Sequence, residues 1–445
     1  NTAPTALNFY ENAINAAARC IAENSLAPTA VCLTSQVGSY LMYSPQLPPH
    51  KMALRGWQAA AASDEIAQFM AARSSGYWQR EIGMQHPMLW SYPGPFLLLQ
   101  KEQEGARFPS FEKLLSIKDY LYYRFTGLFY SDPYTWRGLA MGRELGYSQR
   151  YLQDLGISSS LLPTLAEPGS APGGLLPALA RQLGLAPGTP VYLGCNDFFA
   201  GLLGSGCTGP EAAFDVTGTS EHLGLVQSRP QTQPLLISGP YFSGYANYGV
   251  TASSGSTLRW AETVMADLPE ALPPKELPVF LPYLNGERTP LYTPGASGTV
   301  VGLRETHTRQ DIAAAAVCGV VYSLYSIWKL FPEADTAAVA ALRVTGGATR
   351  IPLYNQIKAD LFGIPLEIPV QSEGSALGAA MLAAVGMGWF CSLHEAAKAW
   401  QPTCRLVTPN PGSRQYHLEA YEKYCRVSRH MSPLFQAGQG PANTT

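Results

Sequence analysis

The chain alternates between segments with a helical hydrophobic period and segments with a strand-like one. Apolar residues recur at helical spacing over residues 6–21 and predict a helix, and the apolar run at 30–35 predicts a short buried strand. The amphipathic stretch 111–125 predicts a second helix, with Gly127 just beyond it as a left-handed C-cap. Helices that alternate with buried strands indicate a layered α/β domain.

The same alternation continues beyond residues 167–190, which are rich in proline and glycine and predict a surface connection with one short helix. The predicted elements are a strand at 190–194, a helix at 197–206, two strands joined by a tight turn at 211–226, a strand, glycine pair and helix at 342–363, and a helix of small residues at 374–386. This order again indicates an α/β domain.

Composition excludes several classes of protein. With 445 residues, 46% hydrophobic and 14% charged, the chain has enough apolar side chains for two or three folded domains and little for disorder. Its 30 basic and 32 acidic residues give a net charge of −2 without long blocks of one sign, which argues against nucleic acid as a partner. The eight cysteines form no close pair, which argues against zinc and redox chemistry.

Neither membrane insertion nor secretion is expected. The longest uncharged run, 312–328, reaches only the lower limit of a membrane span and is broken by Gly319 and two serines, so it predicts a buried helix. The first residues lack the basic patch and apolar core of a secretory signal. We therefore expect no membrane partner and a cytoplasmic location.

Asp197 is the first candidate for chemistry. It follows the apolar strand 190–194 and begins a helix, and α/β folds place their ligands at this end of the strands. A carboxylate at that position can accept a proton. The alternative is a structural role, because aspartate is also a preferred helix N-cap.

Two turns that contain glycine are candidates for binding phosphate or a nucleotide. Thr217–Ser220 joins two strands, and its backbone N–H groups and hydroxyls can surround a phosphate oxygen, although an ordinary hairpin has the same pattern. Gly346 and Gly347 lie between a strand and a helix, where glycine permits close approach of a nucleotide and the N-terminus of the helix offers N–H donors. A tight turn between a strand and a helix also favours glycine. The pair matches neither the Walker A nor the Rossmann spacing.

Taken in order along the chain, these segments resemble the FGGY family of carbohydrate kinases. The resemblance covers most of the chain and is strongest at residues 190–206, 214–224, 279–303, 342–369 and 373–384. It implies an α/β, two-domain actin-like ATPase fold of the ribonuclease H-like type, with a ligand cleft between the lobes. Residues 1–190 would form the N-terminal, sugar-binding domain and residues 191–445 the C-terminal, nucleotide-binding domain, whose final helix could pack back on the first lobe.

The resemblance also implies roles for residues at matching positions. Asp197 would be the general base and an indirect contact of Mg²⁺, and ATP would be the phosphate donor. The residues implied in ATP binding are Gly218, Thr219, Ser220, Gly255, Gly346, Gly347 and Asn355, and those implied in substrate binding are Gln36, Gly38, Ser39, Trp57 and Asp197.

The implied reaction is ATP-dependent phosphorylation of a hydroxyl group of a small-molecule sugar or polyol, as in the xylulokinase-like branch. Residues 36–39 lack the family's histidine, and residues 57–61 keep an aromatic residue but neither charged partner. We therefore expect a ketose or related polyol and hold D-xylulose itself in doubt. A non-catalytic sugar-kinase-like sensor and an actin-like ATPase that acts on protein partners stay open as alternatives. Dimers are common in the family, but the sequence does not decide between a monomer and a homodimer.

Members of the family usually begin with a strand and a phosphate-binding DxGTxS loop, which this sequence does not contain. We expect that the segment exists in the full-length protein. The alternative, a truncated and inactive relative, would leave a large apolar sheet edge exposed.

Overall fold

The chain packs as two compact units. The computed structural model describes residues 5–56, 64–83, 92–141, 144–233, 235–370 and 373–437. Unit 1 consists of residues 1–208, 239–241 and 373–401, and unit 2 consists of residues 209–238, 242–372 and 402–445. The first division, after residue 208, falls later in the chain than the boundary expected between residues 190 and 191. Unit 1 also includes residues 373–401 from the last part of the chain. The assignment of the two family domains to 1–190 and 191–445 stays a prediction.

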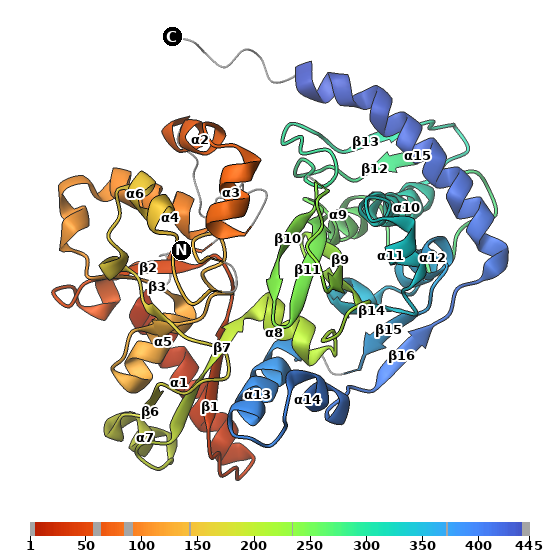
Figure 1. The fold of residues 1–445 in the computed structure, drawn as a ribbon. Coiled ribbons are helices and arrows are strands. Elements are labelled where there is room, and N and C mark those ends of the chain that lie inside the picture. The colour runs from red at the N-terminus through yellow and green to blue at the C-terminus, as the bar shows by residue number, and fades with distance from the viewer. Residues whose placement is uncertain are drawn as a thin grey trace. The chain divides into compact units, whose positions relative to one another are not determined.

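Unit 1 combines short strands with many helices (Figure 1). Its strands are β1 (Val31–Ser35), β2 (Tyr40–Tyr43), β3 (Lys113–Ser116), β4 (Tyr130–Ser131), β5 (Thr164–Leu165), β6 (Gly173–Gly174) and β7 (Pro190–Asn196). Its helices are α1 (Ala6–Glu23), α2 (Asp64–Ala71), α3 (Ser75–Ile82), α4 (Pro93–Glu104), α5 (Ile117–Thr126), α6 (Gln149–Leu155), α7 (Pro177–Leu183), α8 (Asp197–Gly204), α13 (Gly374–Gly386) and α14 (Leu393–Ala399).

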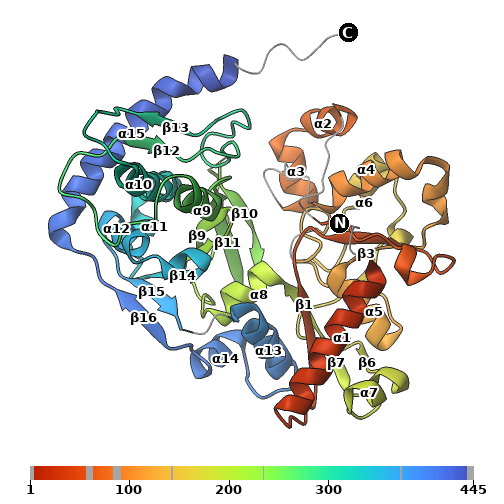
Figure 2. The ribbon, with the colours of Figure 1, turned by 180° about the vertical axis from the view of Figure 1, so that it is seen from behind.

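The three-stranded sheet of unit 1 has the order β1-β7-β6, with β1 and β7 parallel. Figure 2 shows α1 running beside these strands. Its residue Ile14 joins Val191 and Leu193 of β7 and Leu121 of α5 in one buried cluster, as the predicted apolar face of residues 6–21 requires. Because β1 and β7 are parallel, their carboxyl ends meet at one edge of the sheet.

Helices α8 and α13 approach each other unusually closely within unit 1. The approach is possible because both helices carry glycines where they meet. A Cβ atom built on Gly204 would overlap the carbonyl oxygen of Gly374, and one built on Gly378 would overlap the carbonyl oxygen of Ala200. The small-residue patterns at 197–206 and 374–386 therefore serve this contact.

The helix predicted at 111–125 is only partly correct. Residues 113–116 form strand β3, which pairs with β2, and the helix α5 begins at Ile117. Ser116 and Asp119 form a capping box that fixes this start, and Gly127 is the predicted left-handed C-cap with φ 78°. The pairing partner of β3 is about seventy residues earlier in the chain, which local periodicity does not reveal.

Unit 2 is built on a seven-stranded sheet of order β10-β11-β9-β8-β14-β15-β16. The strands are β8 (Ala213–Thr217), β9 (Glu221–Gln227), β10 (Ile237–Tyr241), β11 (Gly244–Val250), β14 (Leu342–Gly346), β15 (Leu366–Pro369) and β16 (Cys404–Val407), and β12 (Val279–Leu281) pairs separately with β13 (Thr299–Val301). The helices are α9 (Gly255–Val264), α10 (Arg309–Trp328), α11 (Glu333–Ala337), α12 (Pro352–Phe362) and α15 (Pro411–Ala437). Helices α9, α10 and α12 lie on one side of the sheet (Figure 1). The final helix α15 packs on α10, α12 and β12 of unit 2. Its packing on the first lobe, which the sequence allowed, stays a prediction.

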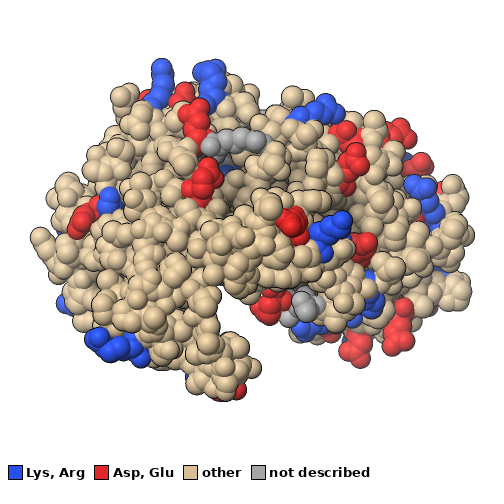
Figure 3. Space-filling view, turned by 60° about the horizontal axis from the view of Figure 1, so that its bottom comes forward, with Lys and Arg blue, Asp and Glu red and all other residues tan. Residues whose placement is uncertain are grey.

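The uncharged run 312–328 lies in α10, as predicted. By length and composition this helix could cross a membrane, but 89% of its most apolar window is buried inside the protein. Thr308 and Asp311 form its capping box, and Lys275 makes an ion pair with Asp311 at 2.7 Å. A buried core helix is thus the observed state of this segment. On the face shown in Figure 3, charged side chains of both signs are interspersed.

Candidate functional site

Asp197 lies where β7 ends and α8 begins, at the edge shared with the end of β1. In the register of the two strands, Ser35 pairs with Asn196, so the segment that follows β1 reaches the start of α8. The backbone N–H of Val37 donates to Asp197 Oδ1 at 3.3 Å. The structure thus brings Asp197 together with the predicted substrate segment 36–39.

The environment of Asp197 favours a carboxylate that can take up a proton. Burial raises its pKa above the ordinary aspartate value, while N–H groups of Val37 and Phe198 oppose the shift. Both of these hydrogen bonds end on Oδ1, the second at 2.8 Å, so Oδ2 is left outside them. A buried carboxylate with a raised pKa at a strand end is a typical candidate for a general base.

The alternative role of Asp197 as a helix cap is wrong, because Asn196 is the N-cap of α8. The Asn196 side chain accepts a hydrogen bond from Phe199 N–H at 2.9 Å, and Asp197 is the first helical residue. Asparagine and aspartate are both strong N-caps. Because Asn196 directly precedes Asp197, the sequence itself offered Asn196 as the cap. The structural role belongs to Asn196, and this leaves the Asp197 carboxylate available for chemistry.

The predicted substrate residues in segment 36–39 differ in exposure. Gln36 is exposed, whereas Gly38 and Ser39 are buried. Gly38 has φ 72°, which lets the chain turn at this point, and the Ser39 carbonyl accepts the Ile117 N–H at 3.3 Å. Gln36 and Val37 are thus the exposed residues of this segment, and contact of Gln36 with substrate stays a prediction. Trp57 lies outside the described residues.

The predicted phosphate turn in unit 2 is the hairpin loop between β8 and β9. Thr217 pairs with Glu221 in the antiparallel register, and Gly218 and Thr219 between them are exposed. The start of α9 holds this turn, since Gly255 N–H donates to the Gly218 carbonyl at 2.9 Å. The N–H groups of Ser254 and Ser256 likewise donate to the Thr219 carbonyl, at 3.0 and 3.3 Å. The hairpin interpretation is thus correct, and the start of α9 is bound to the turn.

The predicted glycine pair lies next to this turn. Gly346 ends β14 beside Thr217, with φ 98°, and a Cβ atom at this position would overlap the Thr217 carbonyl oxygen, so only glycine fits. Gly347 is exposed and begins a 3₁₀ turn that ends at Arg350. Helix α12 starts only at Pro352, because proline favours the first helical position. The glycine pair therefore does not lie at the N-terminus of α12, which corrects the expectation from the sequence.

Asn355, which the resemblance assigns to adenine, is fully buried. Its Nδ2 donates to the carbonyl oxygens of Thr349 and Ile351 at 2.8 and 2.9 Å, and its Oδ1 has no hydrogen-bond partner among the described residues. The amide holds the turn after Gly347 in place. Contact with adenine stays a prediction for this residue.

A buried ion network supports the phosphate turn, and sequence reasoning missed it. Lys358 of α12 makes ion pairs with Asp215 of β8 and, at 2.9 Å, with Glu221 of β9. Tyr354 and Ser254 also donate to Glu221. Burial and the neighbouring Glu221 raise the pKa of Asp215 well above its usual range, whereas Lys358 lowers the pKa of Glu221 against the effect of burial. The network fixes both strands that flank the turn Gly218–Ser220 and the residue before Gly255.

No cluster of three or more histidine, cysteine, aspartate or glutamate side chains suited to a metal ion exists in the part of the chain that the structure describes. Mg²⁺ in phosphoryl-transfer enzymes is usually held by one or two carboxylates together with phosphate oxygens and waters. The carboxylate of Asp197, with Oδ2 outside the two hydrogen bonds, fits such a shared site.

Comparison with known proteins finds two domains of one family in the chain. Residues 70–204 match the N-terminal domain of the FGGY family of carbohydrate kinases, and residues 214–387 match the C-terminal domain of that family. The xylulose kinase of Escherichia coli is 31% identical over 356 residues, which are 76% of this chain and 70% of the relative. The xylulose kinase of Bacillus subtilis is 29% identical over 76% of this chain and 71% of its own, and the gluconokinase of Bacillus licheniformis is 26% identical over 73% and 66%.

Solved structures share the fold. A ligand-bound xylulose kinase from Lactobacillus acidophilus superposes with a TM-score of 0.85 over 97% of this chain and 90% of its own, at 20% identity. The glycerol kinase of Plasmodium falciparum with ADP gives a TM-score of 0.78 over 94% and 88%, at 17% identity. The predicted α/β fold of a two-domain sugar kinase is thereby confirmed.

Proposed function

The chain belongs to the FGGY family of carbohydrate kinases, and from this premise we propose that it phosphorylates a hydroxyl group of a ketose or related polyol with Asp197 as general base. The observation that carries the proposal is the buried carboxylate of Asp197 at the end of β7, hydrogen-bonded to Val37 in the segment after β1. Relatives that are named xylulose kinase and gluconokinase support a sugar-sized acceptor with several hydroxyl groups.

The proposed step needs one proton acceptor. The acceptor hydroxyl oxygen forms a bond to the γ-phosphorus of ATP, its proton moves to the Asp197 carboxylate, and the bond to the β–γ bridging oxygen breaks so that ADP leaves. A carboxylate whose pKa is raised by burial binds this proton more strongly than an ordinary aspartate does.

We assign the nucleotide to the loops of unit 2. The exposed backbone of Gly218 and Thr219 lies against the N-terminus of α9, and the exposed Gly346 and Gly347 lie beside it. Backbone N–H groups of such loops can stabilise phosphate oxygens without covalent chemistry, which is what phosphoryl transfer demands. When bound, Mg²⁺ would neutralise charge on the phosphates, and we assign to Asp197 an indirect contact with it.

The test is phosphoryl transfer from Mg-ATP to a panel of ketoses, polyols and sugar acids by wild type, Asp197→Asn and the control Asp267→Asn, whose side chain is exposed. We expect turnover of at least one ketose or polyol by wild type and the control, and a loss of about 10²–10⁴-fold in Asp197→Asn, the range typical of a removed general base. The amide oxygen of the new side chain can still accept the N–H groups of Val37 and Phe198, so the variant should fold.

The pH profile gives a second readout. The base must be ionised, so activity should fall on the acid side at a higher pH than for an aspartate of ordinary pKa. Turnover retained by Asp197→Asn would place the base elsewhere. Nucleotide binding without turnover of any sugar by wild type would instead support the non-catalytic sensor.

A further inference from the structure

Asn196 connects the start of α8 to a loop of unit 1 that is distant in sequence. Its Nδ2 donates to the Tyr134 carbonyl at 2.8 Å, while its Oδ1 accepts the Phe199 N–H at 2.9 Å. The residue is 3% exposed, so both hydrogen bonds are shielded from water. A side chain that served only as a helix cap would need the second hydrogen bond alone.

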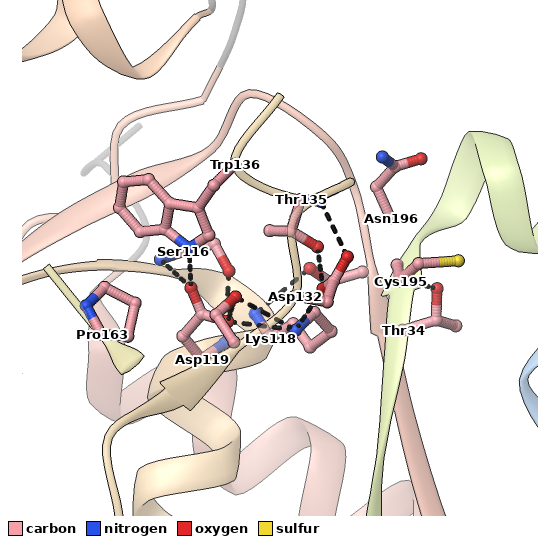
Figure 4. Close-up of polar contacts among 12 residues, drawn as sticks. Thr34, Ser116, Lys118, Asp119, Asp132, Thr135, Trp136, Pro163, Cys195 and Asn196 are labelled. Atoms are coloured by element: carbon pink, nitrogen blue, oxygen red, sulfur yellow. Dashed lines mark hydrogen bonds and ion pairs between the residues drawn. The ribbon is translucent and has the colours of Figure 1, made fainter. Parts of the chain in front are cut away.

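The loop that receives Asn196 is itself fixed by a carboxylate. Asp132 Oδ1 accepts the N–H groups of Tyr134 and Thr135 at 3.0 and 2.9 Å, and Oδ2 accepts the Thr135 hydroxyl at 2.6 Å. Figure 4 shows this carboxylate turned into the loop. These hydrogen bonds set the backbone at Tyr134 and therefore the direction of the carbonyl that Asn196 contacts.

A buried lysine holds Asp132 in turn. Lys118 Nζ lies 2.9 Å from Asp132 Oδ2 and 3.1 Å from Asp119 Oδ1, and all three side chains are fully buried. Asp119 also accepts the Trp136 indole N–H at 3.0 Å, at the far end of the same loop (Figure 4). Because burial alone would lower the pKa of Lys118 and the two carboxylates raise it, the lysine stays charged. Breaking such a pair would leave an unpaired buried charge, so the loop has one strongly favoured arrangement.

Two other contacts hold the backbone beside Asp197. The Thr34 hydroxyl of β1 donates to the Cys195 carbonyl at 2.7 Å, and the Ser375 hydroxyl of α13 donates to the Asp197 carbonyl at 2.9 Å. Both act on the main chain before or at Asp197. Asn196 makes the hydrogen bond to the 132–136 loop, where the Tyr134 ring also packs against the Phe199 ring with centroids 5.5 Å apart. Together these contacts orient the first turn of α8.

We propose that Asn196 is a positioning residue for Asp197, anchored through the Tyr134 carbonyl to the buried Lys118–Asp132 pair. The inference rests on the proposed function, because it concerns the orientation of the Asp197 carboxylate as general base. A misplacement of about 1 Å can lower a rate about 10²-fold without weakening binding. Loss of the Asn196–Tyr134 hydrogen bond therefore lowers kcat and leaves KM for ATP nearly unchanged.

The decisive variant is Asn196→Ser. Serine is as good an N-cap as asparagine and can still accept the Phe199 N–H, but it cannot reach the Tyr134 carbonyl in the same way. The matched control is Ser392→Ala, which removes the N-cap of α14 elsewhere in unit 1. Steady-state kinetics, thermal unfolding and hydrogen–deuterium exchange are measured on the full chain.

We expect kcat of Asn196→Ser to fall about 10- to 100-fold, with KM for ATP within about twofold of wild type. Exchange should become faster in residues 132–136, and the melting temperature should stay close to that of wild type. Ser392→Ala should lose some stability and keep its kcat. A kcat within about twofold of wild type in Asn196→Ser would reduce Asn196 to a helix cap and overturn the inference.

The proposed function and this inference fail in different ways. An inactive wild type, or an active Asp197→Asn, refutes the role of Asp197, and with it the inference. An active wild type, an inactive Asp197→Asn and an unaffected Asn196→Ser refute the inference alone. Asp132→Asn provides a second variant, because it removes the ion pair with Lys118 and keeps an oxygen for the loop N–H groups; its kcat should fall as well.

Discussion

Replacing Gly378 by alanine tests the close contact between α13 and the helix that begins with Asp197. In the native backbone, the new Cβ atom would lie 1.9 Å from the Ala200 carbonyl oxygen, where ordinary contacts begin at 3.4 Å. The overlap is thus about 1.5 Å, and it is made with main chain, which cannot rotate away. The two helices must separate, or α8 must bend.

The expected magnitude follows from two opposing effects. Overpacking of this kind usually costs about 1–3 kcal/mol, and an overlap with backbone belongs at the upper end of that range. Alanine in place of a glycine inside a helix raises the unfolding free energy by about 1 kcal/mol. The net loss of unfolding free energy is therefore about 2 kcal/mol, which corresponds to a fall in melting temperature of about 4–8 °C for a unit of this size.

Gly201→Ala is the matched control in the same helix pair. Its Cβ atom would meet only the Ser375 hydroxyl, at 3.3 Å, and that hydroxyl can shift. We expect this variant to match or exceed the wild-type melting temperature, because the helix gains alanine. Thermal and urea unfolding followed by circular dichroism give the comparison. If Gly378→Ala is as stable as Gly201→Ala, the helices are not in the close contact described, and the reasoning fails.

Two further predictions concern unit 2. Lys358→Met leaves the buried carboxylates of Asp215 and Glu221 without their cation and should lower the unfolding free energy by about 3–5 kcal/mol in urea titrations. Adding Asp215→Asn to this variant should restore part of the lost unfolding free energy. If the double variant is no more stable, unpaired charge is not the cause of the loss. At the start of α10, burial alone would raise the pKa of Asp311, but Lys275 and Thr308 lower it to about 2. Since the folded-state pKa lies below the unfolded value, this stabilisation is present above about pH 4 and is lost toward pH 2. Between these pH values the unfolding free energy of wild type should therefore fall more steeply than that of Asp311→Asn.

Local sequence patterns predicted the elements that are buried by their own apolar residues. The strand at 190–194, the helix at 374–386 and the run 312–328 all formed as expected, because their hydrophobic pattern alone determines that they are buried. The general-base candidate could also be found, since Asp197 directly follows a strand.

Features that depend on distant partners could not be predicted. Residues 113–116 form a strand because β2 pairs with them, and nothing in their own pattern requires it. Lys118 and Lys358 look like solvent-facing residues of amphipathic helices, yet both are fully buried beside carboxylates that neutralise them. The partner Asp215 of Lys358 lies more than one hundred residues away in sequence. The link between Asn196 and Tyr134 is hidden for the same reason.

The late segment Glu373–Gln401 has a consequence for how the protein is made. The ribosome releases residues up to 208 long before it has synthesised α13, which packs on α8, β1 and β7. Until then, the nascent first unit exposes the glycine surface of α8 and one side of its sheet, so it cannot finish folding in the order of synthesis. A stop codon or frameshift before α13 therefore removes the contacts of this helix around Asp197, although that residue itself has long been translated.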